Sequence, residues 1–160
     1  MSISTPIQTH FHWPTSAEAS RIFHGRGGCY PDYRFVNIDW FSPVVLIILY
    51  SEVEREWLDT LCIILRDELG ERCKSIQVQY RFKHLSPYEL LWGEEISAPI
   101  AVEANLKYQL ELGKNQNYGL FFDMEQGRRW VQAHSEGANV LNLFAYTCGF
   151  SVAALAGHAR

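Results

Sequence analysis

Several features that mark whole classes of protein are missing from this sequence. The longest apolar run, Val44 to Leu49, is only as long as a strand, whereas a membrane-spanning helix needs about 20 apolar residues. The first residues, MSISTPIQTHFHWP, have no basic start followed by an apolar stretch, so no secretory signal is expected. The sequence therefore predicts a protein that is neither secreted nor embedded in a membrane.

Positive charge is also scarce. The chain has 14 Lys and Arg residues against 18 Asp and Glu residues, and its formal net charge is −4. A module that binds nucleic acid through charge alone neutralises a run of phosphates with many basic side chains. A strongly basic nucleic-acid module is therefore excluded as the simple interpretation.

Cysteine is sparse and shows no metal-binding pattern. The chain holds four cysteines that form no CxxC pair: Cys29, Cys62, Cys73 and Cys148. Neither a zinc site nor a thioredoxin-type motif is expected from them; scattered cysteines are typical of reduced thiols in a cytoplasmic protein. The pair His10 and His12 has no convergent Cys, Asp or Glu beside it, so no metal site is predicted.

Apolar and aromatic residues, by contrast, suffice for a sizeable core. The 160 residues are 48% hydrophobic and 14% aromatic, in the range of an ordinary globular domain. Prolines and the GRGG string at 25–28 predict an irregular segment over residues 1–34. GRGG could cradle a phosphate with its amides, but a turn-rich loop is favoured, because no strand is predicted before it and no helix after it.

Residues 35–98 predict a small α+β domain. Apolar side chains at helical spacing over 53–69 indicate an amphipathic helix, with a capping box at Ser51 and Glu54 to begin it and Gly70 to end it. Strands are expected on both sides of this helix from alternating or continuous apolar patterns; they span 35–41, 44–50, 75–82 and 89–93. This order predicts a small sheet with the helix on one side.

The pattern changes over residues 99–160, which are predicted as a separate unit. This unit begins with a hairpin over 100–112. A helix is then expected to start at Asp123, with Gln126 as its capping-box partner, and to end at Gly137.

The chain closes on a predicted strand, loop and helix. The strand is expected at 139–144 and the helix at 150–156, and the loop between them holds one glycine, Gly149. Strand–loop–helix is typical of the opening of a nucleotide-binding α/β unit, in which loop and helix amides face the ligand. The loop lacks the GxGxxG pattern, which disfavours a nicotinamide-dependent oxidoreductase.

Two stretches of this last unit resemble a known family. NVLNLFAYTCGFSVAALAGHA, at 139–159, resembles the first cofactor motif of class I S-adenosylmethionine-dependent methyltransferases of the kind that modify bacterial 23S ribosomal RNA. KNQNYGLFFDMEQGRRWV, at 114–131, is similar to the segment that precedes the cofactor strand in that family. The resemblance covers roughly residues 20–160. It implies an α+β N-terminal domain followed by the start of an α/β, Rossmann-like methyltransferase domain.

The resemblance implies S-adenosylmethionine as the cofactor and RNA, such as ribosomal RNA, as the methyl acceptor. Ten positions match those that bind the cofactor in the family: Tyr118, Phe122, Asp123, Arg128, Asn142, Phe144, Tyr146, Thr147, Gly149 and Phe150. Gly149 would let the backbone approach the methionine end of the cofactor, and the amides near Phe150 would face its carboxylate. Each of four positions also has a purely structural interpretation: core packing for Phe122 and Phe144, a solvated helix face for Arg128, and a helix cap for Asp123.

The same resemblance implies that the methyltransferase domain is incomplete in these 160 residues. The second strand, whose acidic residue binds the ribose, and the later loop that positions the base would follow Arg160. The chain alone is therefore expected to be inactive, and no catalytic residue is assigned. Cys148 is rejected as a nucleophile, because it lies in the cofactor loop with no activating His or Lys beside it.

A non-catalytic RNA- or protein-binding α+β module is the alternative function. Its acidic balance counts against RNA, unless the scattered basic side chains cluster in space. The candidates for such a cluster are Arg21, Arg26, Arg34, Arg81 and Lys83.

Overall fold

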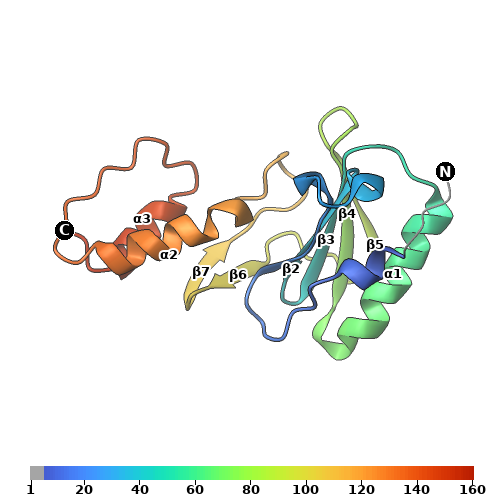
Figure 1. The fold of residues 1–160 in the computed structure, drawn as a ribbon, viewed down its shortest axis with the longest axis horizontal. Helices are drawn as coiled ribbons and strands as arrows, with labels where there is room; N and C mark the ends of the chain where they lie inside the picture. The colour runs from blue at the N-terminus through green and yellow to red at the C-terminus, as the bar shows by residue number, and fades with distance from the viewer. Residues whose placement is uncertain (1–5) are drawn as a thin grey trace.

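A mixed sheet of five strands forms the centre of the larger part of the molecule (Figure 1). The computed structural model describes residues 6–160. The strands lie in chain order: β1 (Ser20–His24), β2 (Val36–Phe41), β3 (Val44–Leu49), β4 (Ser75–Tyr80) and β5 (Tyr88–Gly93). A second, two-stranded sheet is the hairpin of β6 (Ile100–Glu103) and β7 (Leu106–Gln109).

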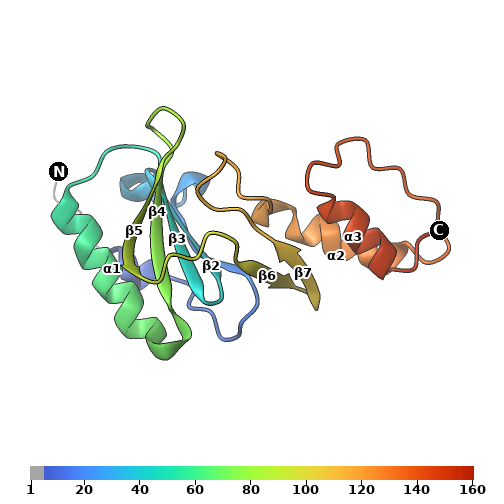
Figure 2. The same cartoon turned by 180° about the vertical axis from the view of Figure 1, so that it is seen from behind.

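Within residues 6–160, three α-helices accompany the sheets: α1 (Arg55–Leu69), α2 (Glu125–His134) and α3 (Gly149–Ala156). Short 3-10 turns lie at Ile7–His10, Gly25–Gly27, Pro31–Tyr33, Gly70–Arg72 and Phe122–Met124. Figures 1 and 2 show α1 at one end of an elongated molecule, α2 and α3 at the other, and the β6–β7 hairpin between them. None of the helices within residues 6–160 is long and apolar enough to cross a membrane.

Strand direction brings three strand ends to one edge of the large sheet. β3 and β4 are parallel, because α1 carries the chain back across the sheet between them. β1 and β3 are both antiparallel to β2, so they too run in the same direction. The carboxyl ends of β1, β3 and β4 therefore lie at the same edge.

Strands β2 and β3 are buried at every position, which explains the continuous apolar sequence of β3. On one face, α1 and the N-terminal segment pack on alternate residues such as Ile38, Val45 and Ile47. On the other face, the chain over 101–122 covers Leu46 and Ile48. The predicted helix on one side is confirmed, but the opposite face is covered by residues 101–122, which follow the predicted small domain.

The prediction of an irregular N-terminal segment is wrong for Ser20–His24. This stretch is β1, in which Ile22 and Phe23 are fully buried. A register shift between Arg21 and Phe23 breaks the alternation of inward and outward side chains, so the sequence shows no period of two. A strand therefore precedes GRGG after all, and a Cβ on Gly25 would lie 1.9 Å from the backbone oxygen of Tyr33.

Both predicted capping boxes are wrong, although the helices they were meant to start are present. Helix α1 begins at Arg55 with Glu54 as N-cap, and no side chain caps it. Residues 50–54 instead turn the chain from the end of β3 onto the face of the sheet. Asp123 lies inside a 3-10 turn, and Met124 is the uncapped N-cap of α2. The predicted end of α1 at Gly70, with φ of 54°, is confirmed.

The strand predicted at 139–144 is absent from the structure. These residues are irregular, and Leu141, Leu143 and Phe144 are 81%, 75% and 93% exposed. A single strand cannot satisfy its backbone hydrogen bonds without a neighbour, and none of the described strands lies beside it. The hairpin before it and the helix after it form as predicted.

Candidate cofactor-binding site

The loop that leads into α3 has a strained backbone. Tyr146 and Cys148 adopt left-handed conformations, with φ of 46° and 61°. This conformation costs a residue with a side chain about 1–2 kcal/mol, and such strain concentrates at functional loops. The amide of Cys148 donates to the carbonyl of Ala145 at 2.6 Å, which closes a tight turn.

Two side chains of this loop attach it to segment 114–131, the second stretch that resembles the methyltransferase family. The Tyr146 hydroxyl donates to the carbonyl of Asn117 at 3.2 Å, and the Thr147 hydroxyl donates to the carbonyl of Gly119 at 2.6 Å. The Tyr146 ring also packs on Phe121, with ring centroids 5.5 Å apart. The two stretches are thus joined in space by hydrogen bonds between residues 28 and 29 positions apart in the sequence.

A cavity of about 450 Å³ lies where the two stretches meet. Its walls include Gln109 from the end of β7, Tyr118 and Gly119 from the preceding segment, and Tyr146 and Thr147 from the strained loop. Its volume lies within the range of about 300–1,000 Å³ that is usual for small-molecule sites. Three of the ten predicted cofactor residues line this cavity.

The start of α3 provides a second part of the site. The amides of its first turn, from Gly149 to Ser151, have no partner inside the helix. The side chain of Asn142 donates to the Ser151 hydroxyl at 3.0 Å and so attaches segment 139–144 to this first turn. A Cβ on Gly149 would make only an ordinary 3.6 Å contact with Arg128. The packing within this chain therefore leaves room at Gly149, as a ligand approaching these amides requires.

Arg128 is buried, so the interpretation that it belongs to a solvated helix face is wrong. Its guanidinium is 4% exposed and forms two hydrogen bonds with the carboxylate of Glu103, at 2.7 and 2.6 Å. A third hydrogen bond reaches the carbonyl of Phe121 at 2.9 Å. This bidentate pair connects α2 to β6. Arg128 is therefore held by a carboxylate of the chain itself, and its contact with a cofactor stays a prediction.

Tyr118 is fixed by a hydrogen bond to strand β2 of the large sheet. Its hydroxyl donates to the buried carboxylate of Asp39 at 2.7 Å. Burial, and then the charge of Asp39, raise the pKa of Tyr118 well above its ordinary value. Its ring therefore stays neutral and apolar where it meets the cavity.

The four remaining predicted residues lie in different surroundings. Phe122 is buried and stacks on Phe41 with centroids 5.3 Å apart, so core packing is part of its role. Phe144 is exposed, so core packing does not apply to it in this structure. Phe150 packs against Gly127 of α2. Asp123 lines a different cavity, described below.

Sequence reasoning missed two kinds of residue at this site. Asn117 and Gly119 contribute backbone carbonyls, which carry no signal in the sequence. Glu103 is 25 residues from Arg128, and nothing in a four-residue strand identifies it as the partner of that arginine.

A protein family model matches most of this chain. The model of the S-adenosylmethionine-dependent methyltransferase family matches residues 20–160. The match includes the large sheet, the hairpin and the cavity with its strained loop.

Curated relatives carry the names of ribosomal RNA methyltransferases. The chain is 35% identical over 150 residues to the ribosomal RNA large subunit methyltransferase of Deinococcus radiodurans, with 87% of this chain and 35% of the relative covered. It is 42% identical over 137 residues to ribosomal RNA large subunit methyltransferase K/L of Hahella chejuensis, with 81% and 19% covered. The chain thus spans about a third or less of the length of these relatives.

Solved structures agree with the sequence matches. A protein of Streptococcus mutans assigned as a SAM-dependent methyltransferase has a TM-score of 0.75 and 28% identity, with 91% of this chain and 38% of that chain covered. A second methyltransferase structure, complexed with SAH, has the same TM-score and identity and covers 89% of this chain and 36% of its own.

Proposed function

This chain belongs to the S-adenosylmethionine-dependent methyltransferase family, and we propose that it forms one wall of the cofactor site of an enzyme that methylates RNA. The observation that carries the proposal is the meeting of the two motif stretches at one cavity. Hydrogen bonds from Tyr146 and Thr147 to the backbone at 117–119 hold them together. The cofactor, when bound, supplies an activated methyl group for transfer.

The residues of this chain would bind and orient the cofactor. The free amides from Gly149 to Ser151 suit the carboxylate at its methionine end, because a helix N-terminus favours negative charge. Tyr118 and Tyr146 offer aromatic walls, and Tyr118 is fixed by its hydrogen bond to Asp39. In this proposal the protein contributes orientation rather than a covalent intermediate.

RNA is proposed as the methyl acceptor on the strength of the relatives. The Deinococcus radiodurans and Hahella chejuensis proteins are both named as ribosomal RNA large subunit methyltransferases. A ribosomal substrate would place this protein in the cytoplasm, where its four free cysteines would stay reduced.

A chimera tests the proposed function. Residues 20–160 would replace the matching stretch of the Deinococcus radiodurans relative, and transfer of a labelled methyl group to 23S ribosomal RNA of that organism would be measured. We expect methyl transfer by the chimera, and loss of transfer when Gly149→Trp fills the space before the first turn of α3. The matched control is Leu155→Trp, at an exposed position of the same helix. A folded chimera without methyl transfer contradicts the proposal.

The alternative of a non-catalytic binding module is favoured by one observation. Of the five candidate basic residues, Arg21, Arg26 and Arg81 line a single cavity, whereas Arg34 and Lys83 do not. The chimera separates the two functions, because a binding module would bind RNA without supporting methyl transfer.

A further inference from the structure

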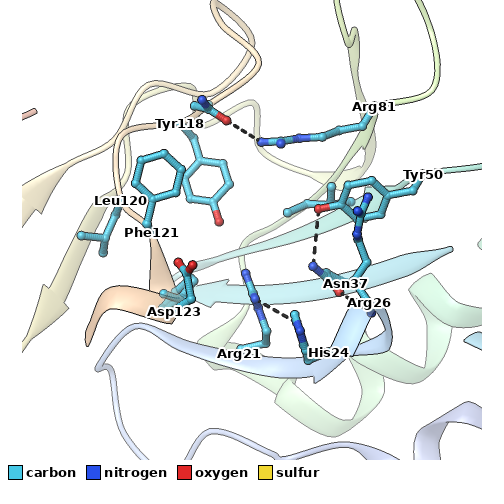
Figure 3. Close-up of a pocket in the computed structure, with 13 residues that line it drawn as sticks. Arg21, His24, Arg26, Asn37, Tyr50, Arg81, Tyr118, Leu120, Phe121 and Asp123 are labelled. Carbon is cyan, nitrogen blue, oxygen red and sulfur yellow. Dashed lines mark hydrogen bonds between the residues drawn. The ribbon is translucent and has the colours of Figure 1, made fainter. Parts of the chain in front are cut away.

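A second cavity, of about 290 Å³, lies where the carboxyl ends of β1, β3 and β4 meet (Figure 3). β1 and the turn after it contribute Arg21, His24 and Arg26. Tyr50 follows β3 and Arg81 follows β4. Residues 117–123 close the cavity from the other side. Arg81 is thus brought beside Arg21 and Arg26, which are distant from it in the sequence, by strands that run in one direction.

Two of these arginines have no carboxylate partner anywhere in residues 6–160. Arg81 donates to neutral oxygens, the side chains of Gln79 and Asn117 and the carbonyl of Gln116, at 2.7–3.1 Å. The Arg26 guanidinium lies 4.2 Å from the centroid of the Tyr50 ring. Both side chains are therefore held in place with their charge uncompensated, which is unexpected in a chain whose net charge is −4.

The other charged groups around the cavity leave it positive. Arg21 forms an ion pair with the buried Asp39, at 2.7 Å, so these two charges cancel. Asp123 is the one acidic side chain in the lining. Burial, and then the charge of Arg21, lower the pKa of His24, so its ring is neutral at pH 7 and accepts or donates hydrogen bonds. The lining thus keeps a net positive charge from Arg26 and Arg81 against Asp123.

The cavity also has an exposed aromatic wall. Phe121 is 45% exposed and lines the cavity beside Tyr118 (Figure 3). Arginine forks match phosphate oxygens in geometry, and unpaired RNA bases stack on exposed aromatic rings. A ligand with carboxylate groups alone would bind the arginines but would not pack on the Phe121 ring, so the two features together favour a nucleotide.

We propose that this cavity binds one nucleotide of a single-stranded RNA, with its phosphate held by Arg26 and Arg81 and its base against Phe121. The choice of RNA rests on the proposed function, whereas the phosphate chemistry rests on the side chains themselves. The cavity is separate from the loop and helix start proposed to bind the cofactor, with only Asn117 and Tyr118 lining both.

The test measures binding of a fluorescent single-stranded RNA of about 12 nucleotides to the 160-residue chain by anisotropy, over about 50–200 mM salt. We expect Arg26→Gln to weaken binding about fivefold at the lowest salt, and to reduce the slope of log K against log salt by about 0.7, the value for one single-strand phosphate contact. Arg26→Lys, which keeps the charge, should restore the slope.

The matched control is Arg66→Gln. Arg66 is a partly exposed arginine of α1, on the opposite face of the sheet. Its substitution should change neither the RNA affinity nor the slope of log K against log salt. The stacking part of the proposal is tested by Phe121→Ala, which should weaken binding with no change in slope. Inorganic phosphate should compete for the site more strongly than an oligoglutamate peptide does.

Three results would overturn the inference: no RNA binding at low salt, equal effects of Arg26→Gln and Arg66→Gln, or equally strong competition by the peptide. The methyl-transfer assay separates this failure from that of the proposed function. If the chimera methylates RNA while Arg26→Gln leaves RNA affinity unchanged, only this inference is wrong. If RNA binds through Arg26 and the chimera transfers no methyl group, only the proposed function is wrong.

Discussion

The large sheet and segment 139–148 both have largely apolar sequences but lie in opposite surroundings. Strands β2 and β3 are buried along their whole length, because α1 covers one face and the chain over 101–122 covers the other. In the segment, Leu141, Leu143 and Phe144 face solvent. An apolar pattern therefore becomes a strand only where neighbouring strands supply hydrogen bonds and a covering layer removes water.

The largest expected effect comes from a side chain of the well-packed region. Phe41→Ala removes a fully buried ring that contacts Tyr118 and Phe122, and should lower the free energy of unfolding by about 3–5 kcal/mol. Phe144→Ala, the matched change in the exposed segment, should alter it by less than about 0.5 kcal/mol. Urea unfolding of both variants measures the difference, and a similar loss in both would refute the contrast.

The buried ion pair is expected to matter almost as much. Glu103→Gln leaves the Arg128 guanidinium buried without a counter-charge, which should cost about 3 kcal/mol. The double variant Glu103→Gln, Arg128→Met removes the stranded charge and should recover most of that loss. If the double variant is less stable than the single one, the pair does not connect α2 and β6 as described.

Thiol reactivity should separate the two regions by about a factor of 100. Burial is the main cause that raises the pKa of Cys73 to about 11, two units above its reference value, so its thiolate fraction at neutral pH falls about 100-fold. Cys148, in the exposed loop, and Cys29 are both accessible and should be alkylated by iodoacetamide well before Cys73. Mass spectrometry of the alkylated native chain checks this, and fast labelling of Cys73 would show that the sheet opens.

The smallest expected effect concerns the strained loop. Cys148→Gly relieves the left-handed conformation and should raise stability by about 1 kcal/mol or less, because the greater freedom of glycine in the unfolded chain offsets part of the gain. The control is Cys29→Gly, outside the strained loop, where no gain is expected. A loss of stability with Cys148→Gly would mean that the loop is not strained.

The sequence predicted the elements whose signal is local and periodic. The α1 helix and strands β2 to β5 were predicted to within a few residues, because each side of these elements faces a uniform environment. The hairpin was predicted too, and its turn has positive φ at Ala104 and Asn105, as a two-residue hairpin loop requires.

The features that were predicted wrongly or missed depend on how strands pair with one another, which a local sequence pattern does not show. β1 was missed because its bulge disrupts the alternation. The strand at 139–144 was predicted from local preference, although strand formation depends on a partner. The clustering of Arg21, Arg26 and Arg81 follows from strand direction, which no local pattern carries.

The most direct test of the central claim is a titration of the isotopically labelled chain with S-adenosylhomocysteine, followed residue by residue in amide NMR spectra. We predict amide shifts centred on 117–123 and 145–151, with no saturation at ligand concentrations of about 1 mM. Two results would contradict it. Saturation at micromolar concentration would mean that this chain alone holds a complete site. Shifts centred on Arg26 and Arg81 would mean that the cofactor binds in the wrong cavity.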